Sequence, residues 1–166
     1  FKATVGLVEQ FGPLRVRDTP ISEQAILGAA MGAAMTGLKP IAEIMFSDFF
    51  AVCFDYIANE FSKSRYMTNG QVKCPLVVRT GNGAGSRFGA QHSQSLHSWF
   101  SHIPGLRVVM PYTPTDARDL LIASTLCDDP VMYIDDRWLY SQECDDSPIR
   151  ELDLRNIGPQ CLRVGK

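Results

Sequence analysis

The sequence has nearly equal numbers of acidic and basic residues, and it has no apolar run long enough to span a membrane. Its 166 residues carry 16 lysine and arginine and 18 aspartate and glutamate side chains, for a net charge of −2. A nucleic-acid-binding domain shows a clustered basic face, so no nucleic-acid partner is expected. The apolar run at residues 25–38 is fourteen residues without a charge. A membrane-spanning helix needs about 20 apolar residues, so no membrane partner is expected either.

The five cysteines are few, scattered and odd in number, and no two of them form a Cys-x-x-Cys pair. This usage favours buried thiols in a reducing compartment, either bacterial cytoplasm or mitochondrial matrix, over a disulfide framework. The first residues, Phe1-Lys-Ala-Thr4, do not read as a signal peptide, and no initiator methionine is present. We therefore expect a fragment, or a chain with further residues before Phe1.

Apolar segments with strand and helix signals alternate along the chain. Strands are predicted at residues 14–17, 40–46, 74–80, 106–110 and 130–134, and helices at 24–37, 49–66, 91–101 and 113–127. Strands joined through helices make right-handed crossovers, which predict an α/β fold with a parallel sheet and helices on both faces. Ligands of such sheets bind at the carboxyl ends of the strands.

Glu23 is the first candidate for chemistry, since it lies at a predicted strand-to-helix junction and precedes the apolar run. An acidic side chain in a first helical turn usually only complements the helix dipole. Burial among apolar neighbours would instead make it a proton-sharing group. The run it precedes has small residues at helical spacing, Gly28 and Gly32 among them, so we expect another backbone to approach this face closely.

Three further features leave alternatives open. The loop at residues 81–89 has Gly81-x-Gly83-x-Gly85 but matches neither a dinucleotide nor a phosphate-binding fingerprint, so it is either a flexible turn or a backbone that lines a ligand. The three histidines are five residues apart, a spacing unlike the i, i+4 pair of helical zinc sites; of these, only His92 lies at a predicted loop-to-helix junction. Phenylalanines 46, 49 and 50 follow a strand, either as core or as an aromatic wall for a flat ligand.

Several motifs occur together in one order. They are Asp18-Thr-Pro-Ile-Ser-Glu23, Gly32-Ala-Ala-Met-x-Gly-Leu-x-Pro-Ile41, Glu43-Ile-Met-Phe46, Arg65-Tyr-Met67, Gly89-Ala-Gln-His-Ser-Gln-Ser95, Pro104-Gly-Leu106 and Asp129-Pro-Val131. In this the sequence resembles the beta subunit of the decarboxylase component of 2-oxo acid dehydrogenases, the group with the pyruvate, branched-chain and acetoin enzymes. The resemblance implies a thiamine-diphosphate-binding fold, with a pyrimidine-binding domain at residues 1–148 and, at 149–166, a linker towards a further domain.

The resemblance also implies a cofactor and roles for four residues. Glu23 matches the glutamate that hydrogen-bonds a pyrimidine nitrogen of thiamine diphosphate, and Phe49 matches the aromatic residue that stacks on that ring. Met45 matches an apolar residue that supports the bent cofactor. His92 matches an active-site histidine that handles the substrate or the lipoyl acceptor. The implied reaction is decarboxylation of a 2-oxo acid and reductive acylation of a lipoyl group.

The implied site needs other chains. The sequence has no Gly-Asp-Gly followed about thirty residues later by Asn, the motif that holds diphosphate and magnesium, and the resemblance places it in a partner alpha subunit. A second, homologous beta subunit and a lipoyl-bearing acyltransferase are the other implied partners, in a heterotetramer. Two alternatives remain: the corresponding domain of a transketolase-like enzyme, and a non-catalytic assembly domain.

Overall fold

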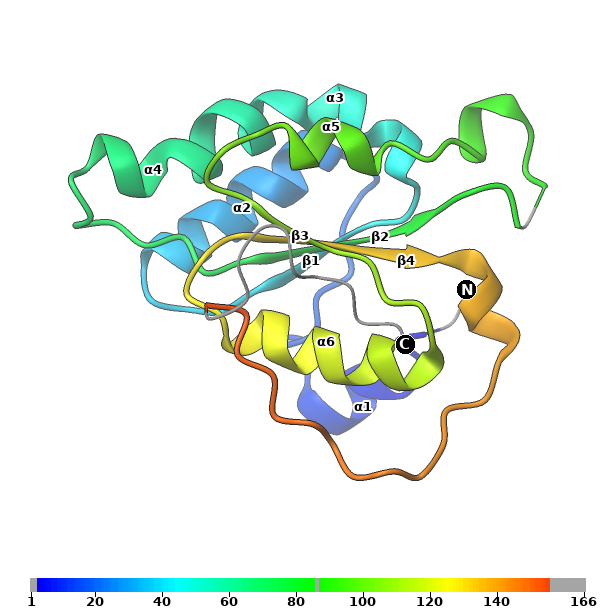
Figure 1. The fold of residues 1–166 in the computed structure, drawn as a ribbon. Helices are drawn as coiled ribbons and strands as arrows, with labels where there is room; N and C mark the ends of the chain where they lie inside the picture. The colour runs from blue at the N-terminus through cyan, green and yellow to red at the C-terminus, as the bar shows by residue number, and fades with distance from the viewer. Residues whose placement is uncertain (1–2, 86, 156–166) are drawn as a thin grey trace.

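A four-stranded parallel sheet forms the centre of the computed structural model, which describes residues 3–85 and 87–155. The strands lie in the order β1, β2, β4, β3, and they span β1 (Ile41–Ile44), β2 (Val77–Asn82), β3 (Arg107–Val109) and β4 (Val131–Asp136). The helices lie in layers on both faces of this sheet (Figure 1). The predicted α/β fold is therefore confirmed.

The upper layer in Figure 1 holds most of the helices. They are α2 (Glu23–Met35), α3 (Phe50–Asp55), a π-helical segment (Tyr56–Phe61), α4 (Ser62–Met67) and α5 (His97–Ser101). The other face is covered by α6 (Pro114–Leu126), and a short α1 (Leu7–Phe11) precedes the core with no buried residue. Each layer has its own apolar core, because successive side chains of a strand point to opposite faces. Val78 and Ile134 thus pack under the upper layer, whereas Val77 and Tyr133 pack against α6.

Local sequence explains the best-formed elements. The central strand β4 is buried along nearly its whole length, as expected of a parallel strand covered on both faces. Helix α6 begins with a capping box: the Asp116 amide donates to Thr113 Oγ1 at 3.1 Å, and the Thr113 amide donates to Asp116 Oδ2 at 3.3 Å. Pro114 at the first helical position needs no amide partner there.

The strand predicted at residues 14–17 is wrong. These residues form a turn after α1, with the amides of Arg15 and Val16 donating to the Gly12 carbonyl, and Leu14 is 82% exposed. A four-residue alternation without a partner strand leaves its backbone groups unpaired, so the local turn bonds prevail. Glu23 consequently follows irregular chain rather than a strand, and Ser22 makes no side-chain cap for α2.

The helix predicted over residues 91–101 is broken. A single 3-10 turn (Ala90–His92) and the short α5 replace it. The Gln94 amide donates to Asp48 Oδ1 at 3.0 Å, and its carbonyl accepts from Ser47 Oγ at 3.2 Å. These tertiary bonds use the backbone groups that a continuous helix would have paired.

The small-residue face of α2 is only partly packed. A Cβ on Gly28 would lie 3.1 Å from the Tyr56 hydroxyl, so this glycine admits the ring of Tyr56. A Cβ on Gly32 would meet nothing within 4 Å. The atoms nearest to Gly28 thus belong to a side chain and not to the backbone that the sequence predicts, and Gly32 has no close neighbour among the described residues. No helix of the described chain is both long and apolar enough to cross a membrane.

Candidate functional site

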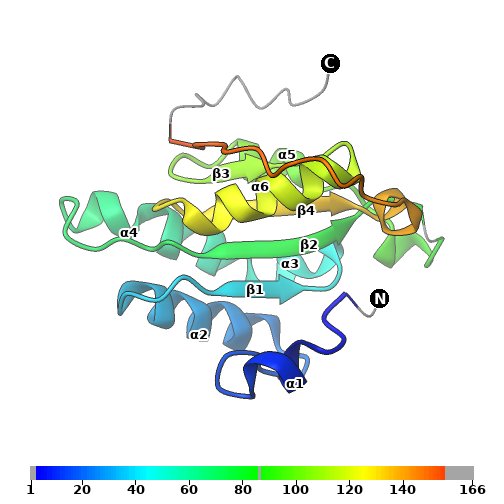
Figure 2. The ribbon, with the colours of Figure 1, turned by 90° about the horizontal axis from the view of Figure 1, so that it is seen from below.

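The carboxyl ends of β1 and β2 bring the predicted site residues to one edge of the sheet. A short connection, residues 36–40, joins α2 to β1, so the helix runs opposite to the strand it precedes. Its first residue therefore lies at the carboxyl edge of the sheet, towards the arrowheads in Figures 1 and 2. Glu23 reaches this edge from the helix, and Met45 and Phe46 reach it directly from the end of β1.

Glu23 is the first residue of α2 and is partly exposed. Burial raises the pKa of the neighbouring Cys53 thiol to about 12, and the negative charge of Glu23 adds to that rise. Gln24 Nε2 donates to the Val52 carbonyl at 3.0 Å and fixes the start of α2 against α3. Cys53 in turn donates to the Phe49 carbonyl at 3.8 Å. Glu23 thus acts electrostatically on a thiol that is hydrogen-bonded to the backbone of Phe49, and its own side chain is only partly buried.

Phe46, Phe49, Phe88 and His92 form an aromatic cluster, with rings that meet edge to face. The ring centroid of His92 lies 4.9 Å from that of Phe46 and 5.2 Å from that of Phe49, and the two phenylalanine rings are 6.2 Å apart. Phe88, from the glycine-rich loop, lies 5.8 Å from Phe46. The structure therefore brings His92 and Phe49 into contact, although 43 positions separate them in the sequence.

The three phenylalanines that could form either core or an aromatic wall differ in the structure. Phe50 is fully buried and packs against Phe100 with ring centroids 4.8 Å apart, so it belongs to the core. Phe46 and Phe49 are half buried at the sheet edge, as an aromatic wall would be. Met45 is 48% exposed beside them and offers an apolar surface at the same edge.

Hydrogen bonds hold the start of the glycine-rich loop in place. The Gly83 amide donates to the Gln94 carbonyl at 3.1 Å, and Ser47 Oγ donates to Asn82 Oδ1 at 3.1 Å. Asp48 is 8% exposed, and its Oδ2 has no hydrogen-bond partner among the described residues. Sequence reasoning missed Ser47, Asp48 and Asn82. The sequence feature that could have identified them is their position, because they are polar residues at or just after the carboxyl ends of buried strands.

Arg137, which sequence reasoning also missed, lies beneath the aromatic cluster with 4% exposure. Its Nη1 donates to the carbonyls of Gly83 and His92 at 2.7 Å each, and its Nη2 donates to the Gly81 carbonyl at 3.2 Å. The guanidinium carbon lies 4.7 Å from the centroid of the Phe46 ring. The backbone of His92 is thereby joined to the end of β2 and to the residue that follows β4.

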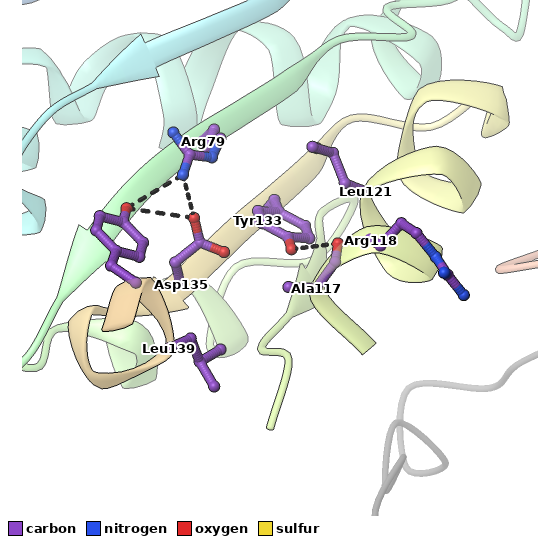
Figure 3. A pocket seen from close by; sticks show the side chains of 8 residues that line it. Arg79, Ala117, Arg118, Leu121, Tyr133, Asp135 and Leu139 are labelled. Carbon is purple, nitrogen blue, oxygen red and sulfur yellow. Dashed lines mark hydrogen bonds and ion pairs between the residues drawn. The ribbon is translucent and has the colours of Figure 1, made fainter. Parts of the chain in front are cut away.

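A second polar cluster lines a cavity of about 240 Å³ on the α6 face of the sheet (Figure 3). Arg79 lies 2.6 Å from Asp135 Oδ2 and 3.0 Å from Glu43 Oε2, and it donates to the Tyr140 hydroxyl at 3.1 Å. Burial raises the pKa of Asp135, against the opposing effect of Arg79. The hydroxyl of Tyr133 donates to the Ala117 carbonyl at 2.7 Å. The charged groups thus pair with one another, and the Tyr133 hydroxyl joins β4 to α6.

Comparison with known proteins places this geometry in a family. The family model described as the transketolase pyrimidine binding domain matches residues 1–142. The chain belongs to this family. A solved structure described as a split gene transketolase, an inactive beta4 tetramer, superposes with a TM-score of 0.66 over 82% of this chain and 42% of that one. At 21% identity, this likeness shows the fold alone.

Curated relatives are more similar in sequence. The beta subunit of the acetoin:2,6-dichlorophenolindophenol oxidoreductase of Bacillus subtilis (strain 168) is 52% identical over 140 residues, which are 84% of this chain and 41% of that protein. A pyruvate dehydrogenase E1 component subunit beta from Rickettsia conorii is 49% identical over 145 residues, 87% of this chain and 44% of that protein. The predicted resemblance to such beta subunits is confirmed. The chain spans less than half the length of these relatives.

Proposed function

We propose that this pyrimidine-binding domain contributes the aminopyrimidine half of a thiamine diphosphate site. The parent enzyme would decarboxylate a 2-oxo acid and reductively acylate a lipoyl group. The observation that carries the proposal is the contact between the ring of Phe49 and the imidazole of His92 at the carboxyl edge of the sheet, the edge at which the partly exposed Glu23 begins α2. Open parallel sheets bind their ligands at this edge.

The side chains present suit an aminopyrimidine. A flat aminopyrimidine ring can share a proton with a carboxyl group at a ring nitrogen and can pack its face on an apolar or aromatic surface. Glu23 supplies the first, and Phe49 and Met45 supply the second, all with part of their surface accessible. The Gly-Asp-Gly…Asn motif that holds diphosphate and magnesium in the family does not occur in this sequence. On that ground we assign the diphosphate and its magnesium to a partner alpha subunit.

Each residue then has a distinct task. When bound, thiamine diphosphate supplies a ring that accepts the electrons released by decarboxylation. The Glu23 carboxyl group would hold a proton at the pyrimidine nitrogen and exchange it during turnover. Phe49 and Met45 would orient the ring and exclude water from its face. The His92 imidazole, held edge-on by two phenylalanines, would donate a hydrogen bond to the substrate oxygen or to the incoming lipoyl sulfur.

The proposal extends to partners and compartment. An alpha subunit, a second copy of the beta subunit and a lipoyl-bearing acyltransferase would complete the reaction cycle. Among the described cysteines, Cys53, Cys74 and Cys127 are buried free thiols. Burial raises the pKa of Cys74 to about 11, which keeps this thiol protonated and unreactive. Such thiols suit bacterial cytoplasm or the mitochondrial matrix.

Calorimetry with thiamine diphosphate and magnesium tests the proposal on this chain alone and after mixing with a candidate alpha subunit. Binding only in the mixture is the expected result. Tight binding by the chain alone would contradict the assignment of the diphosphate to a partner. No binding in any mixture would favour a non-catalytic assembly domain.

Two variants test the assigned residues in the reconstituted enzyme. Glu23→Gln should lower cofactor-dependent decarboxylation at least about 100-fold, because a carboxamide cannot exchange the proton. Its matched control is Glu9→Gln, at an exposed glutamate of α1, which should retain activity. His92→Ala should lower the rate of lipoyl acylation by more than any loss of folding stability explains. Its control is His102→Ala, at an exposed histidine. Near-normal turnover of Glu23→Gln would refute the assignment.

A further inference from the structure

Arg137 is a buried cation that takes part in none of the ion pairs among the described residues. Its side chain is 4% exposed. Taking a charge out of water is costly unless hydrogen bonds or opposite charges replace the lost hydration. Here the replacement comes from three backbone carbonyls and one aromatic face, and its Nε has no partner among the described residues.

The carbonyls that Arg137 binds come from separate places along the chain. Gly81 lies in β2, Gly83 follows the end of that strand, and His92 ends the 3-10 turn. Hydrogen bonds from a charged donor are shorter and stronger than neutral ones, and the fork of guanidinium nitrogens fixes their directions. The two 2.7 Å bonds from Nη1 therefore hold the Gly83 and His92 peptides at a fixed separation.

A second observation points to the same arrangement. A Cβ on Gly81 would lie 3.3 Å from Arg137 Nε, a contact tighter than nine in ten real Cβ contacts. Glycine at this position admits the guanidinium beneath the loop. The same guanidinium stacks on Phe46, whose ring touches the imidazole of His92. Arg137 thus contacts His92 in two ways, through its peptide and through its aromatic neighbour.

We propose that Arg137 is a positioning residue that fixes the imidazole of His92 at the proposed active site. This inference rests on the proposed function of His92. Arg137 lies beneath the aromatic cluster and acts through His92, without contact to a substrate. Loss of the guanidinium should release the Gly83 and His92 peptides together. A displacement of about 1 Å in a reacting group lowers a rate by up to about 100-fold.

A double-mutant cycle in the full-length enzyme, reconstituted with its alpha subunit, tests this coupling. Arg137→Met should lower kcat for lipoyl acylation about ten- to 100-fold and leave the KM for the 2-oxo acid within about twofold. In a His92→Ala background, the same substitution should cost less than about twofold, because the group it positions is already gone. Equal losses in both backgrounds would overturn the proposal, since a general structural role adds to the loss of His92.

A conservative variant and a control variant make the double-mutant cycle more specific. Arg137→Lys keeps the charge but not the fork, so it should restore part of the lost kcat. Arg155→Met is the matched control, because Arg155 is exposed and pairs with Asp153 far from the site. It should leave kcat unchanged. If Arg137→Met fails to fold, Arg137→Lys takes its place in the cycle, with the same outcomes for and against.

An NMR measurement judges the positioning independently of activity. Imidazole signals of the same reconstituted enzyme, labelled only on the beta-subunit histidines, should shift for His92 in Arg137→Met and remain unchanged for His102. An unchanged His92 signal would overturn the inference. If His92→Ala retains full activity while Arg137→Met shifts the His92 signal, the proposed function of His92 fails and the structural coupling stands.

Discussion

Replacing Gly105 by alanine should be among the most damaging small changes to this domain. Gly105 has a φ of +95°, where an L-residue costs about 1–2 kcal/mol of folding free energy. Its added Cβ would also lie 2.0 Å from the Ser62 carbonyl oxygen at the start of α4. Real Cβ contacts stay beyond 3.0 Å, so one of these backbones must move by 1.0 Å or more.

The size of the expected loss follows from these two effects. Overpacking strain of this kind costs about 1–3 kcal/mol. Ser62 has little room to give, since Lys63 beside it donates to the Pro104 carbonyl at 3.0 Å and holds the two segments together. Together with the backbone strain, the free energy of unfolding should fall by about 2–5 kcal/mol. Urea denaturation followed by circular dichroism measures it.

Gly37→Ala is the matched control for this prediction. Gly37 has a similar φ of +100°, but a Cβ there meets nothing within 4 Å. The free energy of unfolding of Gly37→Ala should therefore fall only by the cost of the backbone conformation, about 1–2 kcal/mol. The difference between the two variants isolates the clash with Ser62. Equal losses would refute the reasoning, because they would mean that the packing of Gly105 on α4 contributes nothing.

Three other predictions concern stability. The hydrogen bond from Arg118 holds the pKa of the Asp119 carboxyl at about 2, below its ordinary 3.8. The contribution of Asp119 to the free energy of unfolding is therefore complete above about pH 4 and is lost as pH falls towards 2. Asp119→Asn should flatten that part of a curve of stability against pH, measured by urea titration. Arg79→Met should cost about 3–5 kcal/mol of unfolding free energy in the same assay, because Asp135 would remain buried without its main partner. Gly32→Ala, in open space on α2, should raise the melting temperature through a helix-propensity gain of about 1 kcal/mol.

The elements that local chemistry determines were the ones predicted well. The apolar segment before Asp135 predicted β4, and Thr113-Pro114 predicted the start of α6. The errors lie where long-range bonds decide. Nothing near Gln94 in the sequence shows that Ser47 and Asp48 will bind its backbone and interrupt a helix. Local patterns carry no information about partners that lie tens of residues away.

The candidate site shows the same division. Glu23 and His92 could be singled out because each lies where a loop meets a turn or helix: Glu23 opens α2, and His92 ends a 3-10 turn. Arg137 could not, because its importance depends on three carbonyls that only the folded chain brings together. A charged residue just after a buried strand was the one available signal, and many surface loops share it.

The exposure of the site residues bears on how the proposed enzyme would be assembled. Residues that complete a site within one chain are usually enclosed, since a ligand pocket buries most of its ligand. Here Met45 is 48% exposed, and Glu23, Phe49 and His92 are each partly exposed, whereas Arg137 beneath them is buried. Buried Arg137 thus holds the backbone of His92 in place, while the candidate groups keep part of their surface accessible. This is the arrangement expected of a half-site, because a rigid scaffold keeps the groups in place while a second surface closes over the ligand.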